Sequence, residues 1–242
     1  MVRLPHRPDP LLARPFALYD TVLNDHAEVV GLDFVYHVVG KATAILETIS
    51  PGDELELWGP LGNGFPAATG GRLLCLGGGI GYTPFLAVAR ESLGQRTYGV
   101  ADRGPIPPTT VTLCYGVRSQ PDLADLADFQ NLGPGLDIRL ATDDGTVGHH
   151  GYVTQLLQQI LRNEQRPTAV YVCGPEPMMR SAAEICQSAD LPCWISLETP
   201  MACGFGACFS CVTKVHTATP PGWDYRRTCI EGPVFPSKTL VW

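Results

Sequence analysis

The sequence lacks long apolar runs, an excess of basic residues and a high density of charge. No stretch of about 18 consecutive apolar residues occurs, so we expect no membrane-spanning helix. Lys and Arg number 17 against 24 Asp and Glu, and the net charge of −7 argues against a protein that follows the phosphates of a nucleic acid. Charged residues make up only 17% of the chain, against about 25% in an average globular protein. A weakly charged surface suggests that a partner or cofactor covers part of it.

The first residues also lack the apolar segment of a signal peptide, so we expect a cytoplasmic protein whose thiols stay reduced. The chain contains nine cysteines, and four of them lie between Cys203 and Cys229. A local group of thiols in a reducing compartment predicts a metal site rather than disulfides. Nothing in the sequence suggests a hydrolytic triad or a pair of catalytic carboxylates, and we assign no catalytic side chain.

Periodicity and composition predict a multi-domain chain of three parts. Residues 1–70 hold short strand-like runs at 34–39 and 54–58 and no helical pattern longer than two turns, which predicts part of an antiparallel β-barrel or sandwich. Residues 71–198 alternate strands with helices, which predicts a doubly wound parallel α/β domain that binds a nucleotide. Residues 199–242 combine the cysteines with little periodicity, and we expect this small domain to need its metal to fold.

The middle part gives the clearest secondary-structure signals. A helix is expected to start with Thr83 as its N-cap and Pro84 in its first turn. Apolar residues spaced three and four apart predict helices over 153–161 and 179–186, and a further helix is expected over 123–129. The expected strands are 73–76, 111–115, 136–141, 169–173 and 194–197.

The C-terminal cysteines have the spacing Cys203-x4-Cys208-x2-Cys211-x17-Cys229. C-x4-C-x2-C followed by a distant cysteine is the ligand spacing of plant-type [2Fe–2S] clusters. Glycines between the first two cysteines suit a tight loop, because glycine accepts positive φ and leaves its N–H open towards the sulfides. A structural zinc site is the alternative, but zinc sites usually use two Cys-x2-Cys pairs, and only Cys208 and Cys211 form one here.

A glycine-rich loop, Gly77-Gly78-Gly79-Ile80-Gly81-Tyr82-Thr83-Pro84, connects an expected strand to an expected helix. Bare amides at a helix start bind phosphate groups. The match to G-x-G-x-x-G is imperfect and no acidic residue follows about 20 residues later, so a tight turn without a ligand is the alternative. A second motif ends another strand, at the sheet edge where ligands bind. The predicted dinucleotide site comprises Gly77, Gly78, Gly79, Gly81, Thr83, Pro84, Cys173, Gly174 and Pro175. Arg118 does not decide between NAD and NADP.

A chain that binds both nicotinamide and a [2Fe–2S] cluster needs a third redox group. Nicotinamide transfers two electrons as a hydride, whereas the cluster carries one, and a flavin has the stable one-electron state that connects them. The β-rich first part is where the flavin is expected. Arg14 and its neighbours are candidates for contacts with the flavin phosphates or ribityl chain, and residues 40–43 for amide contacts with the pyrophosphate.

Two segments together resemble a known family. Residues 201–211, MACGFGACFSC, and residues 229–235, CIEGPVF, resemble the electron-transfer subunits of class 1B dihydroorotate dehydrogenases, whose framework is similar to that of ferredoxin–NADP reductases. Residues 77–84, 173–175 and 58–65 also fit this superfamily, so the resemblance covers nearly the whole chain.

The resemblance implies FAD in a barrel, NAD⁺/NADH on the α/β domain and a [2Fe–2S] cluster that faces a partner. The implied partner is an FMN-containing catalytic subunit that oxidises dihydroorotate to orotate in pyrimidine biosynthesis, assembled as a heterotetramer of two copies of each chain. Electrons would pass from that FMN to the cluster, then to FAD and NAD⁺. The implied cluster ligands are Cys203, Cys208, Cys211 and Cys229, and the residues expected to line FAD are Arg14, Pro15, Phe16, Ala17, Tyr36, His37, Val38, Ala42 and Thr43.

Alternatives and departures accompany this interpretation. The runner-up is a flavin and iron–sulfur subunit of a hydrogenase, a sulfide dehydrogenase or a ferredoxin–NADP transhydrogenase; a zinc-stabilised binding module is a third hypothesis. Ala17, His37 and Ala42 stand where the family usually has Ser, Arg and Gly, so weakened FAD binding is expected. About two barrel strands that precede Met1 in relatives are expected to be absent, and our hypothesis is a misassigned start.

Overall fold

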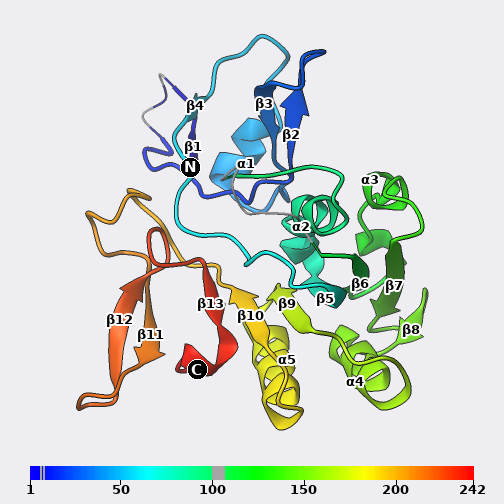
Figure 1. The fold of residues 1–242 in the computed structure, drawn as a ribbon. Coiled ribbons are helices and arrows are strands. Elements are labelled where there is room, and N and C mark those ends of the chain that lie inside the picture. The colour runs from blue at the N-terminus through cyan, green and yellow to red at the C-terminus, as the bar shows by residue number, and fades with distance from the viewer. Residues whose placement is uncertain (6, 8, 100–106) are drawn as a thin grey trace.

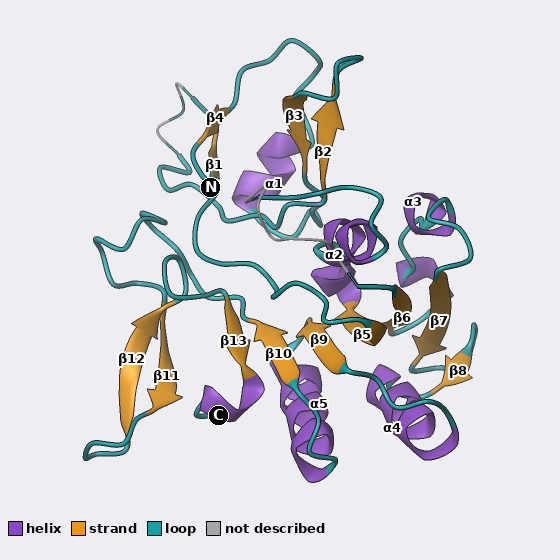
Figure 2. Ribbon diagram, in the orientation of Figure 1, coloured by secondary structure: helices purple, strands orange, loops and turns teal. Residues whose placement is uncertain are grey.

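A central seven-stranded sheet organises the chain in a computed structural model, which describes residues 1–5, 7, 9–99 and 107–242. The strand order is β13-β10-β9-β5-β6-β7-β8 (Figures 1 and 2). Neighbours pair in parallel except β13, which pairs antiparallel with β10. This arrangement confirms the doubly wound α/β domain. The strands are β5 (Gly71–Gly78), β6 (Thr109–Val117), β7 (Leu136–Thr142), β8 (His149–His150), β9 (Ala169–Cys173), β10 (Cys193–Ser196) and β13 (Val234–Pro236).

Helices cover both faces of this sheet. α2 (Phe85–Ser92) and α3 (Ala127–Gln130) lie on one side, and α4 (Val153–Asn163) and α5 (Glu176–Ser188) lie on the other (Figure 1). Successive strand residues point to opposite faces, and both faces are therefore apolar. Leu74, Leu76, Val170 and Val172 pack with α4 and α5, whereas Leu73, Cys75, Tyr115 and Tyr171 pack with α2 and α3.

The periodicity of α4 and α5 predicted their buried faces. Leu157 and Ile160 of α4 and Ala182 and Cys186 of α5 are fully buried against the sheet. Burying each large apolar side chain contributes about 1.5–3 kcal/mol, which exceeds the few tenths that helix propensity supplies per residue. Both helices are therefore held mainly by the sheet.

Two expected helices begin elsewhere. The chain after β5 first forms a 3₁₀ turn over Gly79–Tyr82, so α2 starts at Phe85 with Pro84, not Thr83, as its N-cap. The expected helix at 123–129 is reduced to α3, because residues 123–126 are not helical and the N-cap is Leu126. The Asp125 carboxylate, one residue before that N-cap, accepts a hydrogen bond from the Ala127 N–H at 2.9 Å.

Residues 1–70 form two small antiparallel sheets and one short helix. β1 (Val2–Arg3) pairs with β4 (Glu56–Leu57), and β2 (Asp20–Leu23) pairs with β3 (Val29–Asp33). α1 (Lys41–Leu46) contributes Leu46 to a small core with Val2 and Leu4. The two sheets do not join among the described residues.

The expected strand at 34–39 is wrong, because the strand in this region is β3 and residues 34–39 have no strand partner in the described structure. Aromatic packing explains the difference. The Phe16 ring stacks on Phe34 at 5.0 Å and lies 5.8 Å from Tyr36. The Phe34 and Tyr36 side chains, which would share one face of a strand, therefore pack with Phe16 as an aromatic group. The expected strand at 54–58 is confirmed in its centre as β4.

A buried ionic group joins the first part to the α/β domain. Asp20 of β2 accepts hydrogen bonds from Arg90 of α2, from Arg96 at 2.8 Å and from the Tyr98 hydroxyl at 2.5 Å. Arg96 also donates to the Thr21 carbonyl at 2.6 Å. The Asp20 side chain is only 10% exposed, so this group is largely shielded from water.

The C-terminal segment is built into the main sheet. It contains a hairpin of β11 (Val212–His216) and β12 (Trp223–Arg227), followed by β13. Val234 of β13 enters the core on one face of the sheet, and Phe235 enters the core on the other. This connection is absent from the sequence expectations, because β13 is short and shows no periodicity.

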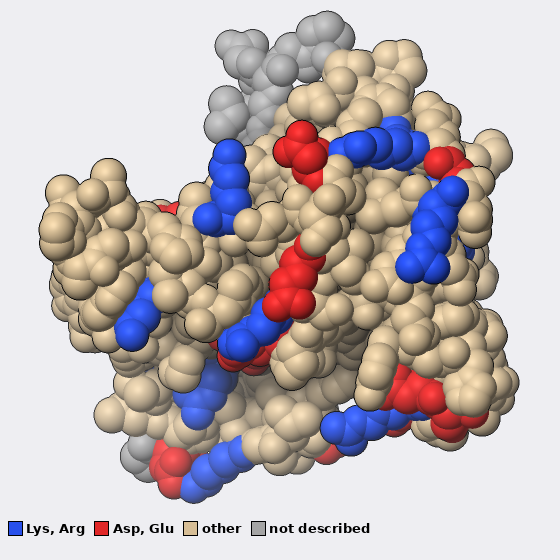
Figure 3. All heavy atoms as spheres, turned by 90° about the horizontal axis from the view of Figure 1, so that it is seen from below, with Lys and Arg blue, Asp and Glu red and all other residues tan. Residues whose placement is uncertain are grey.

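The surface agrees with the low charge of the sequence. On the face in Figure 3, Lys and Arg alternate with Asp and Glu between wide uncharged areas. Within the part of the chain that the structure describes, no helix is both long and apolar enough to cross a membrane.

Candidate cluster, nucleotide and flavin sites

The C-terminal cysteines come together as two pairs of thiols. Cys203 lies close enough to Cys208 to lower its pKa, and Cys229 lies close enough to Cys211 to lower the pKa of that thiol. Cys203 also raises the pKa of Cys229. Among the described residues, no three His, Cys, Asp or Glu side chains converge as they would around a single ion. The preference for a [2Fe–2S] cluster over zinc therefore rests on the cysteine spacing.

The two pairs differ in burial and ionisation. Cys211 and Cys229 are each 2% exposed, whereas Cys208 is exposed. The Ser210 hydroxyl and backbone, together with Cys203, lower the pKa of Cys208 to about 6. Burial raises the pKa of Cys229 to about 11, and it also opposes ionisation of Cys211, but hydrogen bonds from Cys229 leave the pKa of Cys211 lowered. The outer pair thus holds the thiol that ionises most readily, and thiolate is the form that binds metal.

The loop between Cys203 and Cys208 depends on its glycines. Gly204 and Gly206 have φ of +81° and +85°, as the sequence predicts for a tight loop. A Cβ on Gly206 would lie 2.8 Å from Ile230. Arg227 donates to the Gly206 carbonyl at 2.9 Å, and its guanidinium lies 4.6 Å from the centre of the Phe209 ring.

The loop of residues 58–63 fastens the first part of the chain to the cysteine segment. The Trp58 indole N–H donates to the Cys203 carbonyl at 3.1 Å. The Asn63 side chain accepts from the Val234 N–H and donates to the Val234 carbonyl, both at 2.9 Å. A Cβ on Gly62 would lie 2.2 Å from the Gly232 carbonyl oxygen. Sequence reasoning missed this role, because partners about 150 residues apart leave no local signal.

The two glycine motifs meet at the carboxyl end of β5. Cys173 pairs with Gly77 across β9 and β5, and a Cβ on Gly81 would lie 2.2 Å from the Cys173 carbonyl oxygen. A Cβ on Gly78 would lie 2.9 Å from Pro175. Close packing therefore explains why glycine is needed at Gly78 and Gly81, which agrees with the alternative of a tight turn without a ligand. Gly79 differs, because it has φ +55° and open space at its Cβ position.

The position of this meeting point favours a ligand. From β5 the chain continues to β6 and then outward on one side of the sheet, whereas the later strand β9 pairs on the other side of β5. The strand order therefore reverses at β5. Ligands of open α/β sheets bind at such reversals. The Cys173 thiol is half-buried there, and burial raises its pKa to about 12, which keeps it neutral. Arg118 is exposed at the end of β6.

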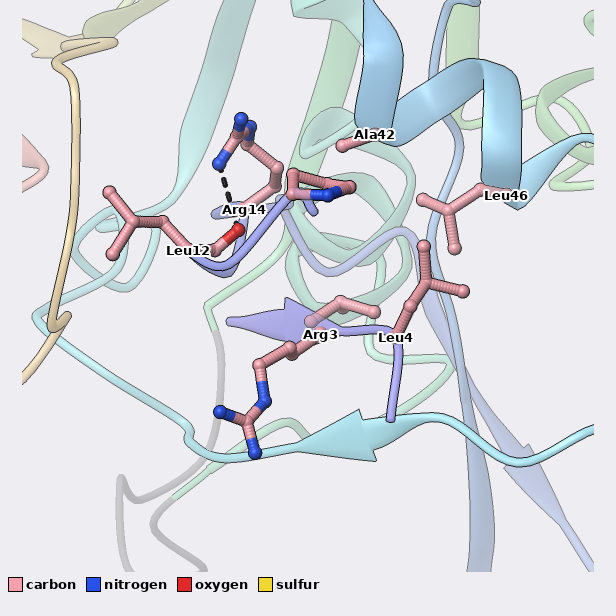
Figure 4. A pocket seen from close by; sticks show the side chains of 8 residues that line it. Arg3, Leu4, Leu12, Arg14, Ala42 and Leu46 are labelled. Carbon is pink, nitrogen blue, oxygen red and sulfur yellow. Dashed lines mark hydrogen bonds between the residues drawn. The ribbon is translucent and has the colours of Figure 1, made fainter. Parts of the chain in front are cut away.

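The expected flavin residues occupy one corner of the first part. Arg14 and Ala42 line a pocket with Leu4, Leu12 and Leu46, and the Arg14 guanidinium donates to the Leu12 carbonyl at 2.9 Å (Figure 4). The pocket volume is about 10 Å³, roughly what one water molecule needs. The flavin site therefore stays a prediction.

The other expected flavin residues are divided between packed and exposed positions. Phe16 and Tyr36 belong to the aromatic group described above. The Thr43 hydroxyl accepts from the Val39 and Gly40 N–H groups at 3.0 and 3.1 Å, so it serves the start of α1. Pro15 is half-buried, whereas Ala17, His37 and Val38 are exposed.

Comparison with known proteins gives the family. The iron–sulfur cluster binding domain of dihydroorotate dehydrogenase B matches residues 198–241, and the oxidoreductase NAD-binding domain matches residues 75–184. The dihydroorotate dehydrogenase B (NAD⁺) electron transfer subunit of Caldanaerobacter subterraneus subsp. tengcongensis is 35% identical over 93% of this chain and 78% of its own. The chain belongs to the family of dihydroorotate dehydrogenase B electron transfer subunits. That of Geobacillus thermodenitrificans is also 35% identical, over 99% of this chain and 84% of its own.

Solved structures agree with the family fold. An NADH-dependent reduced ferredoxin–NADP oxidoreductase has a TM-score of 0.71 and 25% identity, over 95% of this chain and 80% of that chain. The ferredoxin reductase of carbazole 1,9a-dioxygenase shares the fold at a TM-score of 0.55 and 23% identity, over 73% of this chain and 52% of that chain. The dihydroorotate dehydrogenase B domain match contains all four paired cysteines, and the NAD-binding match contains both glycine motifs.

Proposed function

We propose that this chain is the electron transfer subunit of a dihydroorotate dehydrogenase B. It receives electrons from the FMN of a catalytic partner subunit and passes them through a [2Fe–2S] cluster and FAD to NAD⁺, in pyrimidine biosynthesis. The observation that carries the proposal is the two pairs of thiols, which lie in a segment that matches the cluster domain of this enzyme. The same segment joins the NAD-binding sheet through β13.

The proposed assignments follow the three parts of the chain. Residues 1–70 bind FAD, residues 71–198 bind NAD⁺ and residues 199–242 bind the cluster. Cys203 and Cys208 hold one iron, and Cys211 and Cys229 hold the other, because these are the thiols that lie in contact. The two glycine motifs receive the dinucleotide, and the corner around Arg14 and Ala42 receives part of FAD.

The cluster supplies one-electron transfer, and the flavin connects it to two-electron chemistry at nicotinamide. The residues of this chain position these groups. Trp58 and Asn63 fix the first part against the cysteine segment, which sets the separation of flavin and cluster. The close backbone contact between Gly81 and Cys173 shapes the nucleotide edge. Oxidation of dihydroorotate is assigned to the partner, with two copies of each chain in the assembly.

The named relatives favour this function over a subunit of a hydrogenase, a sulfide dehydrogenase or a transhydrogenase. We also propose a cytoplasmic location, because none of the nine cysteines forms a disulfide in the structure, and thiols persist in a reducing compartment.

Reconstitution tests the proposal. The chain is incubated anaerobically with ferrous iron, sulfide and FAD, and its visible absorption and EPR spectra are recorded. Flavin and [2Fe–2S] bands are expected, with reduction of a dye by NADH and no oxidation of dihydroorotate until the FMN subunit is added. A colourless protein with stoichiometric zinc contradicts the proposal, and so does co-purification with a nickel-containing partner.

A further inference from the structure

The Ser210 hydroxyl contacts Cys208, the exposed thiol of the cysteine loop. Its Oγ lies 3.1 Å from the Cys208 sulfur. Cys208 is exposed, and the two residues are separated only by Phe209. The hydroxyl therefore contacts a sulfur that, in the proposed function, binds the iron held by Cys203 and Cys208.

The direction of this hydrogen bond follows from a second contact. The Ala202 N–H donates to the Ser210 Oγ at 3.1 Å. That bond occupies an acceptor site of the hydroxyl and leaves its hydrogen free to point towards Cys208. A metal-bound thiolate carries no hydrogen and only accepts, so Ser210 is the donor of the pair.

Local backbone geometry holds the hydroxyl in this position. Phe209 has φ +57°, which non-glycine residues rarely adopt because it is energetically unfavourable. The Arg227 guanidinium over the Phe209 ring and its bond to the Gly206 carbonyl stabilise the turn. An unfavourable backbone conformation retained by neighbouring contacts indicates that the orientation of the next residue, Ser210, has a use.

The inner pair has a different environment. Cys211 and Cys229 are buried, and the Thr228 hydroxyl donates to the Cys211 carbonyl at 3.0 Å and also lies within hydrogen-bond reach of the Cys211 sulfur. Thr228 shares a further hydrogen bond with Thr199, so several groups compete for its hydroxyl. The two sides of the cluster therefore differ in burial, and Ser210 supplies the hydroxyl on the exposed side.

We propose that Ser210 raises the reduction potential of the cluster by donating a hydrogen bond to the Cys208 sulfur. The inference rests on the proposed function, because it requires a [2Fe–2S] cluster on the four cysteines. Reduction adds one electron and neither forms nor breaks a bond, so the cluster and its thiolates become one unit more negative. A donor aimed at a sulfur stabilises the more negative state more, and hydrogen bonds to the sulfurs are known determinants of cluster potential.

The test compares midpoint potentials of reconstituted protein by EPR-monitored redox titration. Ser210→Ala removes the donor, and Ser210→Thr keeps a hydroxyl at the same position. Ser210→Ala is expected to lower the equilibrium constant for one-electron reduction about tenfold, which corresponds to about 59 mV. Ser210→Thr is expected to retain most of the wild-type potential. Ser188→Ala is the matched control, because the Ser188 hydroxyl of α5 donates to a helix carbonyl.

Measured iron and acid-labile sulfide contents distinguish a failure of the proposed function from a failure of the inference about Ser210. A wild-type chain that binds no cluster overturns the proposed function and this inference together. Equal potentials in wild type and Ser210→Ala, at equal cluster content, overturn this inference alone. If Ser210→Ala does not hold a cluster, Ser210→Gly supplies the second variant without a hydroxyl, and a potential equal to that of Ser210→Thr contradicts the role of the donor.

Discussion

The ionic group around Asp20 gives a sharp prediction for stability. Replacing Asp20 by Asn removes the carboxylate that Arg90, Arg96 and the Tyr98 hydroxyl share. Breaking a fully buried ion pair costs about 3–5 kcal/mol, because the remaining charge stays buried. The Arg90 and Arg96 side chains are 21% and 23% exposed. Because water partly solvates their charges, the expected loss of unfolding free energy falls to about 2–3 kcal/mol.

Urea unfolding measures this loss, with tryptophan fluorescence and far-UV circular dichroism as two probes. Separate transitions by the two probes would show that unfolding passes through an intermediate, as expected if residues 1–70 detach before the α/β domain unfolds. Glu56→Gln is the matched control, because Glu56 pairs with Arg3 and both side chains are more than 40% exposed. Exposed pairs contribute about 0–1 kcal/mol. Equal losses in Asp20→Asn and Glu56→Gln would refute the reasoning that burial makes the Asp20 group important.

Three further predictions concern the remaining sites. Arg139 and Arg72 each donate a hydrogen bond to the Glu164 carboxylate at 2.9 Å, and they lower its pKa to about 2 from 4.5 in an unfolded chain. Its contribution to stability, about 1 kcal/mol after solvent screening, is therefore present above pH 4.5 and is lost as the pH falls towards 2. Glu164→Gln is expected to flatten this acid limb of the stability curve, and an unchanged limb contradicts the prediction. Gly81→Ala places a Cβ against the Cys173 carbonyl and is expected to abolish NADH binding as measured by calorimetry. Gly64→Ala is the matched control, because its Cβ position is open and its φ is not positive, and it is expected to retain the wild-type affinity. Equal affinities in the two variants refute the packing argument. Cys211→Ser is expected to abolish the cluster absorption and Cys114→Ser to preserve it, because Cys114 is buried in β6 far from the cysteine loop in sequence; a cluster retained in Cys211→Ser contradicts the assignment.

The α/β domain was the most predictable part of the chain. Its strands are apolar throughout because helices cover both faces, and the apolar spacing in α4 and α5 directly reflects one-sided burial. Errors arose where local chemistry overrides periodicity. The 3₁₀ turn at Gly79 delays α2, and α3 begins only after its N-cap Leu126, where the Asp125 carboxylate accepts a hydrogen bond from the Ala127 N–H.

The first part was less predictable for a different reason. Residues 34–39 form a run of aromatic and β-branched residues that is typical of a strand, but the Phe34 and Tyr36 rings pack on Phe16. Pairing between strands also depends on partners that the local sequence does not specify.

The candidate cluster site was predictable in its composition and not in its surroundings. Cysteine spacing alone identified the four thiols, because a cluster demands both ligand type and loop length. The contacts of Trp58 with Cys203 and of Asn63 with Val234 join distant segments and leave no periodic signal. The glycines of the nucleotide loop were identified for phosphate binding, yet Gly81 is also required by the carbonyl it packs against.

Strand β13 has a consequence for engineering. Because β13 is the last strand to pair with β10 and fills both apolar faces of the sheet, the cysteine segment cannot be transplanted as a self-contained ferredoxin. A chain cut after residue 198 would leave β10 as an unprotected sheet edge, which is a template for aggregation. A cluster domain that replaces this segment would therefore need its own strand to complete the sheet, or it would have to be joined to a chain that keeps β13.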